Sequence, residues 1–253
     1  MNRNTALLPI LLIAASTLAQ AGSADKLPSG DAALARFALD AALTAYRAAQ
    51  QAAPGSYEAT WKLARALADK STLTKERAEQ KKLILEAEQL ARAAVRLQPA
   101  DSKGHAYLAI SVGKLALFEG GKRKVELSKE VKTEAEQAIA LNPKEDLAYH
   151  TLAIWHREMV GLNFFLRTFA ELFYGKFPPA SLDTAQANLQ QAVALAPTVV
   201  AHRVELGLTL IVAGKRAEAR EQLDKALALP KAWVTDEYYR DLAQRNYRRT
   251  TGT

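Results

Sequence analysis

The sequence of 253 residues contains no cysteine. A disulfide-linked scaffold, a thiolate zinc site and a cysteine nucleophile are therefore excluded. Glycine and proline are scarce, at 12 and 9 residues, whereas residues that enter helices at low cost, such as alanine, leucine and lysine, are abundant. No stretch alternates apolar and polar residues as a half-buried strand does. With 49% hydrophobic and 24% charged residues, the chain is predicted to be an ordered all-α protein.

Residues 1–21 are predicted to be a secretory signal peptide. Arg3 supplies a positive start, residues 6–18 are apolar, and residues 19–21 form a small-x-small cleavage motif. The apolar stretch is shorter than the roughly 20 residues that a membrane span requires, so we expect cleavage near Ala21 and not a retained anchor. Export, most simply to the periplasm, agrees with the absence of thiols that an oxidising compartment would attack. We expect residues 22–30 to be a short linker.

An internal repeat is the clearest pattern in the rest of the chain. In four places an amphipathic helix with a central alanine ends near a proline, which cannot continue a helix because it lacks an N–H and clashes with the preceding turn. These helix ends are residues 91–99, 135–143, 189–197 and 223–230. A leucine followed by a small residue recurs in the preceding helices, at 63–64, 108–109, 152–153 and 206–207. The last unit has the tetratricopeptide length of about 34 residues.

This repeat predicts the fold class. Residues 31–253 are expected to form a tetratricopeptide-like solenoid of helical hairpins, with about four and a half repeats and inserts between the helices of several repeats. One hairpin cannot bury its own apolar stripe, so neighbouring hairpins bury one another and the array has a concave and a convex side. A helix from about residue 235 to 248 is expected to cap the last repeat. An irregular helical bundle is the alternative interpretation.

The chain also resembles a known family. Residues 152–158, 161–162, 172–175 and 178–181 are similar to the signature of the regulator of microtubule dynamics family, and the similarity extends back through 61–65 and 104–109. The resemblance implies a tetratricopeptide-like protein that is not an enzyme. Animal members of the family associate with microtubules or organelle membranes. An exported chain would meet no microtubules, so the resemblance implies the fold and not that activity.

An aromatic insert lies at about residues 162–181. On a helix, Phe165, Phe169 and Phe173 would share one face, opposite Arg167 and Glu171. Such a helix can be part of the core, folded back over the stack. It can also be a hydrophobic lid or a lipid-contacting helix, which would make the protein a carrier or sensor of a lipid or small apolar ligand. Both interpretations stay open at this stage.

Two further inserts, residues 70–82 and 120–132, are rich in charge of both signs. Mixed signs at helical spacing are typical of a solvated helix face. Neither stretch has the interleaved aromatic residues that single-stranded nucleic acid binding favours, so no nucleic-acid partner is predicted. Attraction to an anionic membrane surface or an acidic polymer is the alternative.

The concave face is the predicted binding surface for an unidentified protein or peptide. In tetratricopeptide arrays the first helix of each pair lines this face, and tryptophan and arginine are common anchors of protein contacts. The face becomes apolar toward the C-terminus, where we expect the aromatic insert or the C-terminal helix to cover it. The candidate partner-binding residues are Trp61, Arg65, Lys114, His150, Arg157 and Glu158.

No catalytic motif is evident. The histidine pair at positions 150 and 156 is six residues apart, and so lacks the i, i+4 spacing of a helical metal site. Neither a nucleophile elbow nor a glycine-rich phosphate loop is present. We therefore predict a binding protein without enzymatic activity, cofactor or metal.

Overall fold

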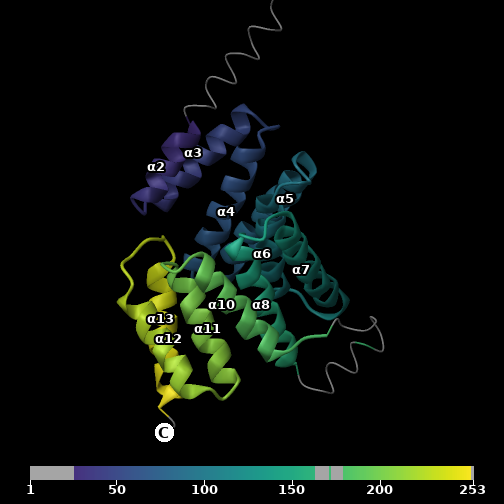
Figure 1. Cartoon of the computed structure of the whole chain (residues 1–253). Helices are drawn as coiled ribbons and strands as arrows, with labels where there is room; N and C mark the ends of the chain where they lie inside the picture. The colour runs from purple at the N-terminus through teal and green to yellow at the C-terminus, as the bar shows by residue number, and fades with distance from the viewer. Residues whose placement is uncertain (1–25, 163–170, 172–178, 252–253) are drawn as a thin grey trace, which may run out of the picture.

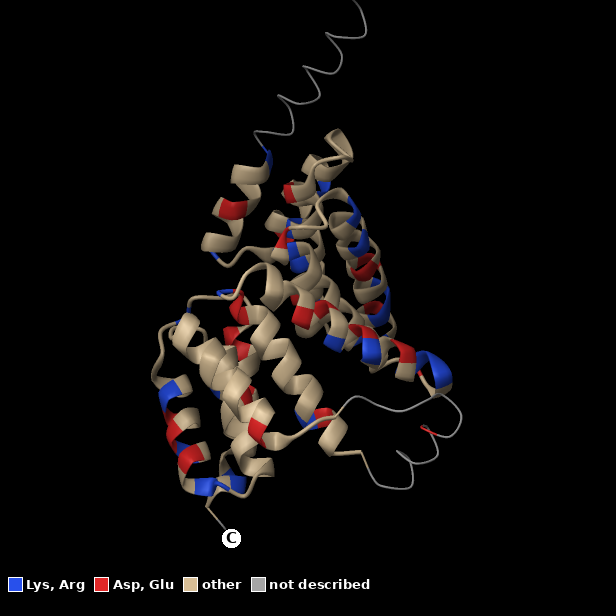
Figure 2. Ribbon diagram, turned by 45° about the vertical axis from the view of Figure 1, so that its right-hand side comes forward, with Lys and Arg blue, Asp and Glu red and all other residues tan. Residues whose placement is uncertain are grey.

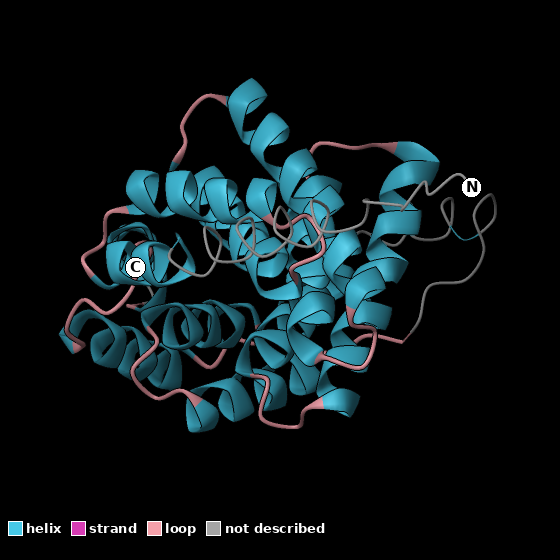
Figure 3. Ribbon diagram, turned by 90° about the horizontal axis from the view of Figure 1, so that it is seen from above, coloured by secondary structure: helices cyan, strands magenta, loops and turns pink. Residues whose placement is uncertain are grey.

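The computed structural model describes residues 26–162, 171 and 179–251, and this part of the chain consists of helices and connecting loops without strands (Figure 3). The predicted all-α class is confirmed. None of the described helices is long and apolar enough to cross a membrane. The helices are α2 (Lys26–Ala35), α3 (Leu39–Ala52), α4 (Tyr57–Leu73), α5 (Arg77–Leu97), α6 (Ser102–Ala116), α7 (Gly121–Leu141), α8 (Asp146–Val160), α10 (Leu182–Leu195), α11 (Val200–Val212), α12 (Arg216–Ala228) and α13 (Asp236–Tyr247).

The helices pack as consecutive hairpins, in the order that the repeat predicts (Figure 1). The hairpins are α4 with α5, α6 with α7, α8 with α10, and α11 with α12; α2 and α3 form a shorter pair before them. Each hairpin also packs against the next one, as in a solenoid. The side chains of Ser56, Asp101 and Ser181 accept hydrogen bonds from backbone N–H groups in the first turns of α4, α6 and α10, which fixes where these helices begin.

The seams between hairpin helices are built from the repeated alanine and leucine positions. The four repeat alanines are completely buried, and the leucines of the leucine-small pairs are at most 6% exposed. A Cβ at Gly207 would stand 2.6 Å from Cδ2 of Leu223, so the small residue of the last pair is required by the close approach of α11 and α12. The four repeat alanines of these seams are Ala94, Ala138, Ala192 and Ala226.

The N-terminal boundary differs from the prediction. Helix α2 begins at Lys26, so residues 26–30, expected to be linker, are helical. Gly30 explains how this helix packs, since a Cβ there would stand 2.3 Å from the ring of Tyr46 on α3. Gly30, inside the expected linker, thus allows close helix contact.

The two charged stretches are helix extensions and not separate inserts. Residues 70–82 form the last turn of α4, the short connection 74–76 and the first turns of α5, while residues 121–132 begin α7. Helices α5 and α7 are each 21 residues long, and Figure 2 shows blue and red residues along α7. The extra length is accommodated because charged side chains can project into solvent beyond the hairpin core.

Helix α13 is the predicted C-terminal cap. Val204, Leu223 and Ala243 form one buried cluster, against which Tyr239 and Leu242 of α13 pack. The apolar end of the array is thus covered by the chain itself, as expected. The aromatic insert lies almost entirely outside the described residues.

Candidate binding surface on the inner helices

The first helices of successive hairpins, α4, α6, α8 and α11, lie next to one another and present one continuous face, which we call the inner surface. At the junction of α4 and α6, the rings of Trp61 and Tyr107 stack with centroids 5.6 Å apart and planes 7° apart. On the same junction, Nζ of Lys114 donates a hydrogen bond of 2.7 Å to Oγ1 of Thr72. Polar and aromatic contacts therefore link helices that are not hairpin partners.

The junction of α8 and α11 is held by an ion pair. Nη1 of Arg157 lies 2.7 Å from Oε2 of Glu205 and also donates to Oγ1 of Thr209, at 3.3 Å. The two charged side chains are only 13% and 9% exposed, so little water screens their attraction. Arg157 thus connects two repeats, and little of its guanidinium is left for another molecule.

A histidine chain lies at the same junction. Nδ1 of His202 is 2.9 Å from Nδ1 of His150, and Nε2 of His202 is 2.7 Å from Oδ2 of Asp146. Burial holds the pKa of His150 well below its usual value, and the positive charges of Arg157 and Lys114 act in the same direction. His150 is therefore a neutral, packed side chain.

The connection between α12 and α13, residues 229–235, contacts the inner surface at α4; we call it the C-terminal segment. In Figure 1 it is the loop that rises from α12 toward α2. Nε1 of Trp233 donates a hydrogen bond of 3.3 Å to Oδ2 of Asp69 on α4, and the guanidinium of Arg65 lies 3.8 Å from the centre of the Trp233 ring. Val234 is 8% exposed and belongs to the core cluster that includes α4 residues.

Asp69 is the carboxylate of this site. Burial raises the pKa of the Asp69 carboxyl to about 6, against the opposing effect of the Arg65 and Lys114 charges and of the hydrogen bond from Trp233. Burial lowers the pKa of Lys114, while the charges of Asp69 and Glu205 raise it. The inner surface therefore holds charges of both signs in a poorly solvated environment.

The six candidate residues differ in how accessible they are. Trp61 is half-buried, His150 is buried, and the side chain of Glu158 is 67% exposed at the edge of α8. Arg65, Lys114 and Arg157 come together on the inner surface, with their charged groups engaged by Trp233, Thr72 and Glu205. The lid residues Phe165, Phe169 and Phe173 lie outside the described residues.

Sequence reasoning missed Asp69 and Trp233. Asp69 lies in the second half of a helix whose repeat motif draws attention to positions 61–65, and Trp233 lies in a loop. The available signal was Trp233 itself, because a large aromatic residue directly after a proline-containing helix end has to be buried somewhere.

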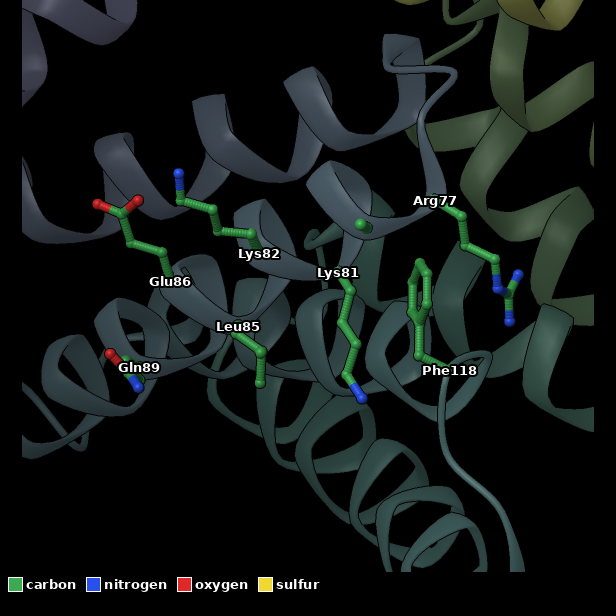
Figure 4. A pocket seen from close by; sticks show the side chains of 8 residues that line it. Arg77, Lys81, Lys82, Leu85, Glu86, Gln89 and Phe118 are labelled. Atoms are coloured by element: carbon green, nitrogen blue, oxygen red, sulfur yellow. The ribbon is translucent and has the colours of Figure 1, made fainter.

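The outer side of α5 carries a shallow hollow, shown in Figure 4. Its charged residues are already engaged: Arg77 lies 4.7 Å from the centre of the Phe118 ring and donates to the carbonyl oxygen of Leu117, and Lys81 lies 2.9 Å from Glu119. The hollow is therefore a solvated, internally paired helix face. Its lining residues are Arg77, Ala78, Lys81, Lys82, Leu85, Glu86, Gln89 and Phe118.

The described residues contain no group of three or more histidine, aspartate or glutamate side chains that could hold a metal ion. The histidines have structural partners. His105 Nδ1 is 2.6 Å from Glu134 Oε2, and His156 Nδ1 accepts a hydrogen bond of 3.4 Å from the backbone of Ser181. These contacts are those of packed helical histidines.

The chain matches a known family model and is similar to several known proteins. A family model described as "Regulator of microtubule dynamics protein 1-3" matches residues 22–249. The chain is 29% identical over 175 residues to regulator of microtubule dynamics protein 1 of Mus musculus, covering 68% of this chain and 57% of the mouse protein. It is 28% identical over 178 residues to regulator of microtubule dynamics protein 3 of Rattus norvegicus, covering 70% of this chain and 37% of the rat protein.

The chain thus spans about half, or less, of the length of these curated relatives. Among solved structures, it is similar to a thermophilic TPR protein of Thermus thermophilus, with a TM-score of 0.66 at 21% identity. That match covers 91% of this chain and 100% of the Thermus chain. It shows that the fold is that of a tetratricopeptide repeat protein.

Proposed function

Because this chain belongs to the regulator of microtubule dynamics protein 1-3 family, we propose that it is a protein-binding scaffold that works without catalysis. Its partner is an extended protein or peptide segment that lies along the inner surface. The tetratricopeptide fold supports this function, because stacked hairpins offer a long surface instead of an enclosed pocket.

The observation that carries the proposal is the composition of the inner surface. Trp61, Arg65 and Lys114 lie on consecutive first helices, and aromatic and arginine side chains are the usual anchors of protein contacts. The same surface already accommodates a non-helical stretch of backbone, the C-terminal segment with Trp233. A surface that receives one non-helical segment offers contacts that a segment of a partner can use.

We also propose that the protein acts in the cell envelope, most simply in the periplasm. The signal-like residues 1–21 and the absence of cysteine support this location. The relatives are named for microtubule dynamics, but an exported chain would not meet that polymer. We therefore propose that the fold and the binding face are shared with them, while the partner differs.

Site-specific photo-cross-linking in cells tests the function. A photo-reactive amino acid at Glu158, on the edge of the inner surface, is expected to give a discrete protein adduct in the envelope fraction. The matched control is Lys82 on the outer side of α5, whose side chain is 78% exposed, and it should give no such adduct. Adducts from position 82 with none from position 158 would contradict binding at the inner surface.

A further inference from the structure

The C-terminal segment has the features of a bound peptide. Its residues are outside helices, and the indole of Trp233 touches the inner surface at two points, the carboxylate of Asp69 and the guanidinium of Arg65. The contact joins residues 164 positions apart in the sequence. The hairpins also pack against their own neighbours, so this contact adds to the packing of the repeats.

The shape of the segment is set locally. The backbone N–H groups of Ala232 and Trp233 both donate to Oδ2 of Asp236, each at 2.8 Å, and Asp236 itself is 1% exposed. This turn at the start of α13 presents the indole toward α4. The presentation of Trp233 is thus independent of the surface that receives it.

The first hairpin supplies a further contact to the same segment. Nζ of Lys231 lies 4.9 Å from the centre of the Phe37 ring, in the turn between α2 and α3. Phe37 has a φ of 60°, in the left-handed region that a bulky residue rarely adopts, and its ring remains 39% exposed. The turn therefore holds an aromatic face outward at the place where the lysine lies.

These contacts are weaker and wetter than the seams. Trp233 is half-buried, Ala232 and Lys231 are exposed, and the indole N–H makes a single hydrogen bond, whereas Val234 is buried in the core cluster. A cation over an aromatic face and one such hydrogen bond are each modest when water has access. The contacts of residues 231–233 can therefore open while the hairpins stay packed.

We propose that the inner surface at Arg65 and Asp69 is a receptor site for a tryptophan carried by a peptide, and that Trp233 of the C-terminal segment occupies this site until such a peptide replaces it. The proposal rests on the proposed function and names the chemistry of the partner. Asp69 accepts the indole N–H and Arg65 covers the ring face, so tryptophan is preferred over phenylalanine, which has no N–H to donate.

The tethered segment competes with any free peptide. A short tether gives an effective concentration of about 1 mM, so a peptide in solution binds the intact chain weakly. Removal of the Trp233 side chain lifts this competition and leaves Arg65 and Asp69 in place. Binding in trans should therefore appear when the internal occupant is weakened.

The test is a fluorescence-anisotropy titration of the full chain with a fluorescein-labelled synthetic peptide of residues 229–236. The Kd for Trp233→Ala is expected to be at least about tenfold lower than for the unaltered chain. The same peptide with alanine in place of its tryptophan should not bind. The matched control is Tyr238→Ala, because Tyr238 is 37% exposed on α13 and has no described contact with α4, so this variant should bind the peptide as the unaltered chain does.

Two further variants are measured in the same peptide titration. Trp233→Phe retains the ring and packing, so if Trp233→Ala fails to fold, a severalfold gain in Trp233→Phe supports the proposal. Adding Arg65→Ala to either variant should remove the binding. Equal peptide affinity for the folded Trp233 variants and the unaltered chain, or binding that Arg65→Ala leaves intact, would overturn it.

The result is separable from the proposed function. Loss of the peptide effect, together with inner-surface cross-links from Glu158 in cells, would reject the tryptophan site and retain the scaffold. Peptide binding together with adducts confined to the outer side of α5 would reject the scaffold function and leave the site as an internal contact.

Discussion

The seams between hairpin helices and the inner surface are held by different interactions. A seam consists of fully buried alanine and leucine, such as Leu223 and Ala226, whose partners are the neighbouring helices in the chain. The inner surface carries charged and aromatic residues, such as Arg65, whose contact with Trp233 of the C-terminal segment is partly exposed and joins distant parts of the sequence. The comparison separates the part of the molecule that maintains the fold from the part that is available for binding.

The largest effect is expected from a seam. Leu223→Ala removes a completely buried side chain between α11 and α12, so it should lower the free energy of unfolding by about 2–5 kcal/mol. Urea denaturation followed by circular dichroism measures the change. Val212→Ala on α11 is the control, since Val212 is 46% exposed and its truncation should change stability by less than about 0.5 kcal/mol. Equal effects would show that the seam is not a close-packed element.

Substitutions at two glycines also test how closely the seam helices pack. Gly207→Ala places a Cβ 2.6 Å from Leu223, so overpacking should destabilise the protein by about 1–3 kcal/mol. Gly113→Ala on α6 places a Cβ 3.5 Å from Val131, an ordinary contact, and should instead stabilise its helix by about 0.5–1 kcal/mol. Thermal denaturation of the two variants should shift the midpoint in opposite directions. A shift in the same direction would contradict the packing described for α11 and α12.

A smaller effect is expected in the pH dependence of stability, which the ionisable groups of the inner surface determine. Because the folded-state pKa of Asp69, about 6, exceeds the unfolded value of 3.8, the folded protein binds more protons between these pH values. The contribution of Asp69 to stability therefore rises as pH falls from about 6 to about 4. Asp69→Asn removes the penalty of a buried carboxylate and should be more stable than the unaltered chain at pH 8. The gain is at most about 3 kcal/mol, and smaller because Asp69 keeps some solvent access.

The contribution of His150 to stability changes with pH in the opposite direction to that of Asp69. Its folded-state pKa lies well below 6.5, so the unfolded chain binds the proton first and stability falls as pH decreases below about 6.5. In Asp69→Asn this loss is no longer offset by Asp69. Urea unfolding at several pH values between 4 and 8 should therefore give a steeper decline for the variant. A shallower decline would show that Asp69 is not the group that offsets it.

Much of the fold could be predicted from the sequence, because the repeat reports local neighbours. The alanine and leucine-small positions identified the seams, and the helix expected from about residue 235 is α13. The charged stretches were interpreted as inserts because a repeat period cannot distinguish an insertion from a longer helix; α5 and α7 are continuous through them.

The candidate site was predictable only in part. Position within the repeat placed Trp61, Arg65 and Lys114 on one surface. It could not show that Arg65 lies over Trp233, because that contact depends on how the whole array brings its last connection back to α4. Contacts between residues of distant repeats do not produce a periodic pattern in the sequence.

Hydrogen exchange of the full chain tests the difference between the two regions most directly. We expect the backbone amides of Ala232 and Trp233 to exchange through a local opening, at least about tenfold faster than the buried amides of α11, because the contact of Trp233 with α4 can open while the seams stay closed. If these amides exchanged at the same rate as those of α11, through global unfolding alone, the C-terminal segment would be a fixed part of the fold and the claim that it is replaceable would be contradicted.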